Sequence, residues 1–331
     1  MKVVLIPGDG IGQEISQSVK EVSEALSCPI EWEEYKAGAD YYKESGNLIE
    51  PGTLEAIQKT GIALKGPTAT PVGTGFRSIN VQLRQHFHTY ANLRPVHSIP
   101  GIKSRYENVD LVIVRENTED LYKGIEYMLD EDTANGVKLI TRKACERIVT
   151  FAFDYAVKHH RKKVTAVHKA NIMKLTDGLF LDAFHHVAES YPDIEADDVI
   201  IDALCMKLVM DPTRFDVLVT ENLYGDIISD LCAGLVGGLG FAPSANIGED
   251  VRIYEAVHGS APDIAGQNKA NPTALLLSFA MLLKDNGMMD KAEKLENAIY
   301  SLTKEGKHLT ADVGGSSTCT EFTKAIIERL D

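Results

Sequence analysis

Hydrophobic runs alternate with longer amphipathic stretches along this chain of 331 residues. Short apolar runs bounded by turn residues predict buried strands at 3–6, 62–65, 109–114, 164–168, 199–202 and 215–220. Helical periodicity predicts helices at 15–26, 35–46, 53–59, 145–159, 171–189, 227–235, 271–284 and 292–304. We interpret the acidic segment 127–137 as a turn region and the glycine-rich segment 234–248 as a connection between domains. This alternation is typical of an α/β protein.

The region after the strand at 215–220 carries a pair of acids. Asn222 and Gly225 predict a turn, and a helix follows it. Asp226 and Asp230 are four residues apart, so both carboxylates project from one face of that helix, among apolar neighbours. Oxygen ligands with no thiol or imidazole nearby suit Mg²⁺ or Mn²⁺. The alternative is a solvated helix face with two ordinary acids.

Positive side chains are concentrated although the chain is acidic, with a formal charge of −14 at pH 7. That charge argues against binding to nucleic acid or to an anionic membrane surface. Asn80 and Arg84 share a helix face with Arg77, and Arg94 and Arg115 add to the same cationic set. Such a set predicts an anionic, carboxylate-bearing ligand. The alternative is that each arginine pairs with one of the many surface acids.

Polar residues also follow several predicted strands. Arg115, Lys169, Asp202 and Asn222 each stand at a strand end, where open α/β sheets place their ligands. The turn at 8–12 is only a weak match to a dinucleotide fingerprint, because position 13 is Gln, and we interpret it as structural.

The five cysteines form no CxxC pair, which fits a reducing compartment. The first residues pass directly into a strand pattern, and no apolar run approaches the roughly 20 residues that span a bilayer. From these observations we expect a cytoplasmic protein.

Four motifs together resemble one family. They are Thr70-Pro-Val-Gly with Arg77-Ser78-x-Asn80-x3-Arg84, Arg115-Glu-Asn-x-Glu-Asp-x-Tyr122, His168-Lys169-x-Asn171, and Asn222-Leu-Tyr-Gly-Asp226-x3-Asp230. The chain resembles the β-decarboxylating dehydrogenases, which act on isocitrate, isopropylmalate or homoisocitrate, from its first strand to its last helix. The resemblance implies an α/β fold without a Rossmann fingerprint. A large cofactor-binding domain would comprise 1–98 and 251–331, and a small dimerising domain 99–250.

The resemblance also implies the substrate and the cofactor. Ser78 and Asn80 look like the pair that binds the γ-carboxylate of isocitrate, with Arg84, Arg94 and Arg115 as further substrate ligands. The alternative is 3-isopropylmalate or homoisocitrate dehydrogenase; isopropylmalate enzymes carry leucine-type side chains in this region. The implied NAD-binding residues are Thr70, Glu255, His258, Gly259, Ser260, Ala261, Pro262, Asp263, Ile264, Asn271 and Asp312. Asp263 favours NAD over NADP, because a carboxylate accepts ribose hydroxyl protons and repels a 2′-phosphate.

The implied reaction is oxidative decarboxylation of isocitrate to 2-oxoglutarate and CO₂. Asp226 and Asp230, with Asp202 of the partner subunit, resemble the ligands of Mg²⁺ or Mn²⁺ in a homodimer with a shared site. Lys169, also from the partner, resembles the group that helps deprotonate the hydroxyl, and Tyr122 resembles the acid that protonates the enol. A rival interpretation is a regulatory subunit without activity. The presence of the aspartates, the lysine and the tyrosine argues against it.

Overall fold

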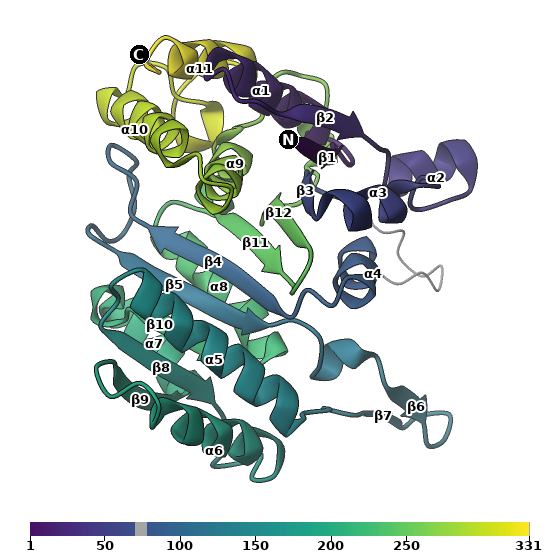
Figure 1. The fold of residues 1–331 in the computed structure, drawn as a ribbon, viewed down its shortest axis with the longest axis vertical. Coiled ribbons are helices and arrows are strands. Elements are labelled where there is room, and N and C mark those ends of the chain that lie inside the picture. The colour runs from purple at the N-terminus through teal and green to yellow at the C-terminus, as the bar shows by residue number, and fades with distance from the viewer. Residues whose placement is uncertain (70–77, 331) are drawn as a thin grey trace. The chain divides into compact units, whose positions relative to one another are not determined.

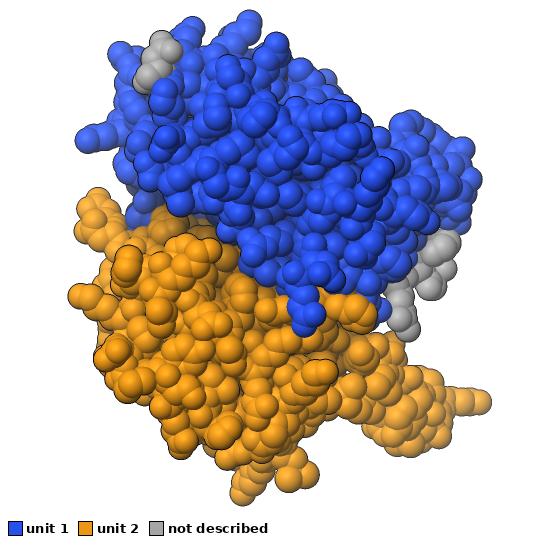
Figure 2. Space-filling view, viewed as in Figure 1, with its two compact units in different colours: residues 1–87, 98–105, 237–331 blue, residues 88–97, 106–236 orange. Residues whose placement is uncertain are grey.

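The computed structural model describes residues 1–69 and 78–330 of the chain. It divides into two compact units, coloured separately in Figure 2. Unit 1 comprises 1–87, 98–105 and 237–331, and unit 2 comprises 88–97 and 106–236. These ranges differ from the expected domains in that 88–97 belongs to unit 2, whereas 99–105 and 237–250 belong to unit 1. The role of the smaller domain in dimerisation stays a prediction.

Unit 1 is an α/β unit built from both ends of the chain (Figure 1). Its elements are β1 (Lys2–Ile6), α1 (Gly12–Ala25), β2 (Glu31–Glu34), α2 (Ala39–Ser45), α3 (Thr53–Thr60), β3 (Ile62–Lys65), α4 (Ile79–His86), η3 (Leu239–Phe241), β11 (Pro243–Ile247), β12 (Arg252–Ala256), η4 (Pro262–Ile264), α9 (Thr273–Asp285), α10 (Met289–Glu305), η5 (Ala311–Val313) and α11 (Cys319–Ile327). Its strands lie in the order β2-β1-β3-β12-β11, parallel except for β11, which runs antiparallel to β12.

Both faces of this sheet are covered, which explains why β1 is apolar from Val3 to Ile6. Helix α9 packs on β11 and β12 and contacts α1 and α10, and α11 packs against α1 and α10. On the other side, a core cluster joins Val4 and Ile6 of β1 to Ile57 of α3 and to Ile79 and Leu83 of α4. Helix α4 is thus fixed against the sheet by its apolar face.

Unit 2 is a second α/β unit (Figure 1). Its elements are β4 (Ala91–His97), β5 (Asp110–Glu116), η1 (Leu121–Lys123), β6 (Glu126–Met128), β7 (Ala134–Gly136), α5 (Arg142–Lys158), β8 (Lys163–His168), α6 (Thr176–Ala188), β9 (Glu195–Ile200), α7 (Ile201–Met210), η2 (Pro212–Arg214), β10 (Val217–Thr220) and α8 (Asn222–Leu235). Its strand order is β4-β5-β10-β8-β9, parallel except for β4. β6 and β7 form a separate antiparallel hairpin.

Helices cover this sheet as well: α5 and α6 pack against each other and against its strands, and α7 and α8 form another contacting pair. A buried cluster that includes Leu111, Ile113, Leu218, Ile228 and Cys232 fixes α8 against β5 and β10. The parallel strands β5, β8 and β10 therefore end beside the start of α8. The predicted α/β architecture is confirmed.

Several predicted boundaries were wrong for identifiable reasons. Helix α8 begins at Asn222, so Gly225 lies inside a helix and not in a turn. The polar strand β9 ends at Ile200, which places Asp202 in the first turn of α7. Strand β9 carries acids because it is an edge strand, and apolar periodicity does not detect such strands.

Other segments differ in the same way. The supposed turn at 127–137 contains most of the β6–β7 hairpin, and the supposed connection at 234–248 contains strand β11. Helix α6 begins at Thr176, and only 39–45 of the expected helix at 35–46 is helical. Among the described residues, no helix is both long and apolar enough to cross a membrane.

Candidate active site

Arg115 is the centre of a polar cluster in unit 2. It is the last residue but one of β5, and it is only 1% exposed. Its Nε and one terminal nitrogen donate to Oδ1 of Asn222, at 3.0 and 2.7 Å, and its other terminal nitrogen binds Asp226. A Cβ added to Gly225 would lie 2.5 Å from Cγ of Arg115, so the glycine lets this arginine lie against α8. Close approach explains the glycine that the sequence suggested as a turn residue.

Arg94 and Tyr122 complete this cluster. Arg94, on β4, donates to Asn92 at 2.6 Å and to Ser229, and it lies 3.6 Å from Asp230. The Tyr122 hydroxyl donates to Oδ2 of Asp226 at 2.6 Å, and the Arg115 guanidinium lies 5.0 Å from the tyrosine ring centre. Burial, then the bond to Asp226, raises the pKa of Tyr122, so the phenol stays protonated at neutral pH.

Asp226 and Asp230 stand one turn apart on α8 with side chains 42% and 59% exposed. Burial raises the pKa of Asp230; Arg94 opposes this effect, and the Asp226 carboxylate adds to it. Two neighbouring carboxylates fit a hard divalent cation in donor type. Among the described residues, however, no group of three or more His, Cys, Asp or Glu side chains lies close enough to hold a metal ion. The three predicted ligands therefore do not form one set within a single chain.

Asp202 is paired instead with Lys169, whose ammonium group binds its carboxylate. The bond to Lys169 lowers the pKa of Asp202. Lys169 follows the last residue of β8, and its backbone N–H donates to Oδ2 of Asp177 at 2.7 Å. The structure thus brings Lys169 and Asp202 together.

The sequence did not indicate a buried charge cluster next to Lys169 and to the start of α8. Lys138 binds the carboxylates of Asp177 and Glu221, and Glu221 immediately precedes α8. Burial raises the pKa of Glu221 to about 8. The charge of Lys138 opposes this rise, and the charge of Asp177 adds to it. One ammonium between two buried acids is balanced when one acid is protonated. No short-range spacing relates these three positions, so sequence patterns could not find them.

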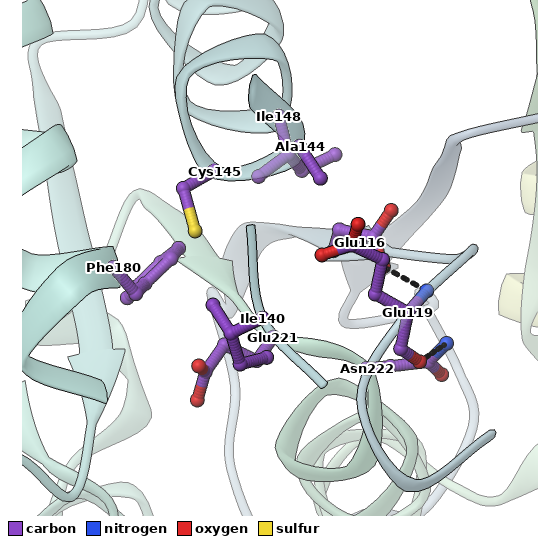
Figure 3. Close-up of a pocket in the computed structure, with 9 residues that line it drawn as sticks. All are labelled: Glu116, Glu119, Ile140, Ala144, Cys145, Ile148, Phe180, Glu221 and Asn222. Atoms are coloured by element: carbon purple, nitrogen blue, oxygen red, sulfur yellow. Dashed lines mark hydrogen bonds between the residues drawn. The ribbon is translucent and has the colours of Figure 1, made fainter. Parts of the chain in front are cut away.

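A small cavity lies beside Glu221, with a volume of about 10 Å³, enough for a single water molecule. Figure 3 shows Cys145 and Phe180 on one side of this space, with Glu116 and Glu119 on the other. Oε1 of Glu221 is buried without a hydrogen-bond partner among the described residues. Burial raises the pKa of Cys145 to about 12, so this thiol is not a nucleophile at neutral pH.

In unit 1, the predicted substrate residues lie on or next to α4. Ser78 precedes the helix and is exposed, and Oδ1 of Asn80 accepts a hydrogen bond from Thr68 at 3.3 Å. Arg84 is buried, and it donates to Asn246 at 3.0 Å and to Glu255 at 3.2 Å. Arg77 lies outside the described residues.

Glu255 is enclosed by partners, although we predicted that it binds the cofactor. Its carboxylate lies 2.9 Å from Lys65 and 3.2 Å from Arg84, and accepts from Asn246 at 2.7 Å. Burial alone would raise the pKa of Glu255, but Lys65 and Arg84 outweigh this effect and lower it. In this arrangement Glu255 orients Arg84.

The predicted cofactor loop follows β12 and contacts the glycine turn at 8–12. The N–H of Ile11 donates to the carbonyl of Ser260 at 2.9 Å, and a Cβ on Gly10 would lie 2.0 Å from that oxygen. The turn therefore packs against the loop. Ala261 has φ of 39°, a left-handed conformation that is strained for a residue with a Cβ and that clusters at ligand sites.

Asp263 is exposed, and its carboxylate makes no hydrogen bond or ion pair within the described part of the chain. It caps no turn, so this group is accessible to a ligand. The nearby Lys269 donates to Gln267 at 2.8 Å.

The remaining predicted cofactor residues surround this loop. Burial lowers the pKa of His258, whose Nδ1 contacts the carbonyl of Gly259 at 3.0 Å. Asn271 donates to Asp312 at 3.0 Å while its Oδ1 accepts from Thr273 at the start of α9. Pro262 and Ile264 bound the turn η4 itself. Thr70 lies outside the described residues.

Comparison with known proteins identifies the family. The family model described as isocitrate/isopropylmalate dehydrogenase matches residues 2–326. The chain belongs to this family.

Among solved structures, the isocitrate dehydrogenase from Methylococcus capsulatus is 48% identical to this chain. The two structures superpose with a TM-score of 0.96, and the match covers 99% of both chains. The mitochondrial NAD isocitrate dehydrogenase catalytic subunit 5 of Arabidopsis thaliana is 54% identical over 98% of this chain and 87% of its own. A mitochondrial NAD isocitrate dehydrogenase regulatory subunit from Dictyostelium discoideum is 53% identical over 99% of this chain and 92% of its own.

These relatives contradict one expectation. Both curated proteins are named mitochondrial, so the predicted cytoplasmic location was wrong. An acidic chain with unpaired cysteines fits any reducing compartment, and this composition could not distinguish one such compartment from another.

Proposed function

We propose that this protein is an NAD-dependent isocitrate dehydrogenase that converts isocitrate to 2-oxoglutarate and CO₂. The proposal rests on the Arg115–Asp226–Tyr122 cluster, which joins a carboxylate-binding cation, a candidate metal ligand and a protonated phenol. Relatives about half identical over nearly the whole chain are named NAD isocitrate dehydrogenase subunits. We infer the same substrate and the same hydride acceptor for this chain.

Isocitrate has three carboxylates, which arginine side chains would bind. Arg94 and Arg115 would bind carboxylates through their planar guanidinium groups, held by Asn92 and Asn222. Arg84 is held in the same manner by Asn246 and Glu255. Ser78 and Asn80 would hydrogen-bond the γ-carboxylate, whereas the alkyl group of 3-isopropylmalate would leave these polar groups unsatisfied, at about 1–3 kcal/mol each.

A divalent ion fits the carboxylates of α8. Asp226 and Asp230 would hold Mg²⁺ or Mn²⁺ together with Asp202 of the partner subunit, which replaces the ligand that one chain lacks. Bound there, the ion would polarise the hydroxyl and the adjacent carboxylate of isocitrate. Burial first, and then repulsion from Asp226, raises the pKa of Asp230, and a bound ion would relieve this repulsion.

The protein groups would act on protons at two stages. The hydroxyl carbon of isocitrate gives a hydride to NAD⁺. The neutral amine of the partner subunit's Lys169 accepts the hydroxyl proton, directly or through a water molecule. The β-keto acid so formed loses CO₂, and the bonding electrons remain on the substrate as an enolate. The Tyr122 hydroxyl then protonates the enol carbon, which yields 2-oxoglutarate. The phenol can take this role because it carries its proton at neutral pH and is held 2.6 Å from the Asp226 carboxylate, beside the candidate metal ligands.

The preference for NAD is attributed to Asp263 in η4. Its accessible carboxylate would accept both ribose hydroxyl protons, and it would repel the phosphate of NADP. Asn271, Asp312 and the loop 258–264 after β12 would line the same cofactor, as would Thr70.

A homodimer is proposed because exposed apolar side chains lie near the candidate ligands. Met206, Val209 and Met210 on α7 and Ile227 on α8 are each 45% exposed or more in the single chain. Helices α7 and α8 also carry Asp202, Asp226 and Asp230. A second copy covering these helices would bury the apolar groups beside the shared site.

A steady-state assay of the purified chain tests the function. Isocitrate and 3-isopropylmalate should each be offered with NAD⁺ and with NADP⁺ at saturating Mg²⁺. We expect turnover with isocitrate and NAD⁺ and little with the other three combinations. Turnover of 3-isopropylmalate would favour the alternative dehydrogenase. No turnover in any combination would favour a regulatory subunit, such as the relative from Dictyostelium is named.

A further inference from the structure

The imidazole of His168 is buried at the end of β8, where it is only 4% exposed. Its Nδ1 lies 3.0 Å from the backbone nitrogen of Ala170 and accepts that N–H, and its Nε2 lies 3.1 Å from Oδ2 of Asp198. Because Nδ1 accepts, the ring proton resides on Nε2 and is donated to the Asp198 carboxylate. Asp198 thereby fixes both the tautomer and the orientation of the ring.

These bonds determine the path of the backbone on both sides of Lys169. The N–H of Lys169 donates to Asp177 at 2.7 Å, and its carbonyl accepts from Ile172 and Met173 at 2.9 Å each. The next N–H, that of Ala170, is held by His168. Consecutive amides are therefore fixed from opposite elements, by the strand end and by α6.

We propose that His168, oriented by Asp198, is a positioning residue that fixes the turn from which Lys169 extends. This inference rests on the proposed function, in which Lys169 accepts the hydroxyl proton of isocitrate. The imidazole itself touches no reacting atom. Displacing the turn would move Nζ of Lys169, and a misplacement of about 1 Å can cost around 10²-fold in rate.

Two substitutions separate the two contacts of the ring. His168→Asn places an amide oxygen near the position of Nδ1, where it can accept the Ala170 N–H two residues on, but it loses Asp198. His168→Gln places a donor near the position of Nε2, which keeps Asp198 and loses Ala170. His185→Gln is the matched control, since His185 also lies near Asp198, at 3.9 Å, but is 58% exposed.

We expect His168→Gln to lower kcat about 10- to 100-fold while KM for isocitrate and for NAD⁺ stays within about twofold. We expect His168→Asn to keep kcat within a few-fold of the unaltered protein, and His185→Gln to leave it unchanged. Reduction of supplied oxalosuccinate should be slowed in His168→Gln, whereas its decarboxylation should not. An unchanged kcat in His168→Gln would overturn the proposal, as would parallel losses in both His168 variants with a common fall in melting temperature.

Hydrogen exchange gives a readout that does not depend on activity. Amide exchange across 167–173 should accelerate in His168→Gln and stay slow in His168→Asn. Unchanged exchange in His168→Gln would refute the role of the imidazole even if isocitrate is the substrate. Conversely, the unaltered protein could fail to oxidise isocitrate while the two variants show this exchange pattern. That result would contradict the proposed function and still support the role of His168 in positioning the turn.

Discussion

Asp263 is the residue on which the cofactor preference depends. Its carboxylate is exposed and forms no ion pair within the described part of the chain, so its negative charge faces an approaching nucleotide. We expect NAD⁺ to be preferred over NADP⁺ by at least about 10²-fold in kcat/KM, because the carboxylate would repel the 2′-phosphate of NADP⁺ at close range. Asp263→Lys with Ile264→Tyr should erode this preference mainly through a higher KM for NAD⁺.

Asp263→Asn is the control for this prediction, because it keeps a hydrogen-bond acceptor and removes the charge. It should fall between the unaltered protein and the double variant. A preference for NADP⁺ in the unaltered protein would contradict the role given to Asp263.

Glu221 predicts a pH-dependent stability. Its pKa of about 8 lies above the ordinary value of 4.5, so the folded state holds this proton more tightly than the unfolded chain does. The resulting stabilisation is present at low pH and is lost as pH rises through about 8. Between pH 6 and 9 the unaltered protein should lose on the order of 1–3 kcal/mol from this group.

The corresponding measurement is the melting temperature at pH 6 and at pH 9. Glu221→Gln keeps the shape but cannot ionise, so its melting temperature should fall less over this range. Glu293→Gln, which removes an exposed acid on α10, should behave like the unaltered protein. An equal fall in Glu221→Gln would mean that Glu221 is already ionised at pH 6.

At the level of elements, helix α8 is shaped around Arg115. A methyl group on Gly225 would lie 2.5 Å from Cγ and 2.7 Å from Cβ of this buried side chain, and these atoms are not at its flexible end. Gly225→Ala should therefore displace Arg115 and lower kcat/KM by about 10²-fold, despite the better helix propensity of alanine. Steady-state kinetics and thermal melting would both detect this change.

Gly234, in the same helix, provides the matched control. A Cβ there meets nothing within 4 Å, so Gly234→Ala should add about 0.5–1 kcal/mol of stability without altering the kinetics. Equal kinetics in the two alanine variants would show that Gly225 is not required by the packing of Arg115.

The elements also show what the sequence could predict. The buried strands β1, β5, β8 and β10 were located by their continuous apolar runs, which only a sheet covered on both faces requires. Strand β9 was misplaced because it is an edge strand and its first four residues include three acids, so it has no continuous apolar run.

The candidate site divides in the same way. Asp226 and Asp230 are related by helical spacing, which a sequence displays directly. Lys138, Asp177 and Glu221 are brought together only by the fold, from a loop and the starts of two helices. Glu255 was assigned to the cofactor by resemblance, and only the structure reveals the three partners that surround its carboxylate.

At the level of the whole molecule, the proposed dimer predicts complementation between inactive chains. Asp202→Asn and Asp226→Asn should each lower turnover by orders of magnitude while the protein stays folded, because a metal site needs its full ligand charge. In a dimer with one copy of each variant, one shared site carries both defects and the other carries neither. Such a mixed dimer should therefore regain up to half of the activity of the unaltered dimer.

The experiment requires subunit exchange between the two variants, verified by native mass spectrometry of differently tagged chains. Mixing Asp226→Asn with Asp230→Asn is the control, since both of these ligands come from α8 of the same chain and every site then keeps a defect. Recovery in the first mixture and none in the second would place Asp202 in the site of the partner subunit. If verified exchange restores no activity in either mixture, the ligands are not shared between two copies of this chain.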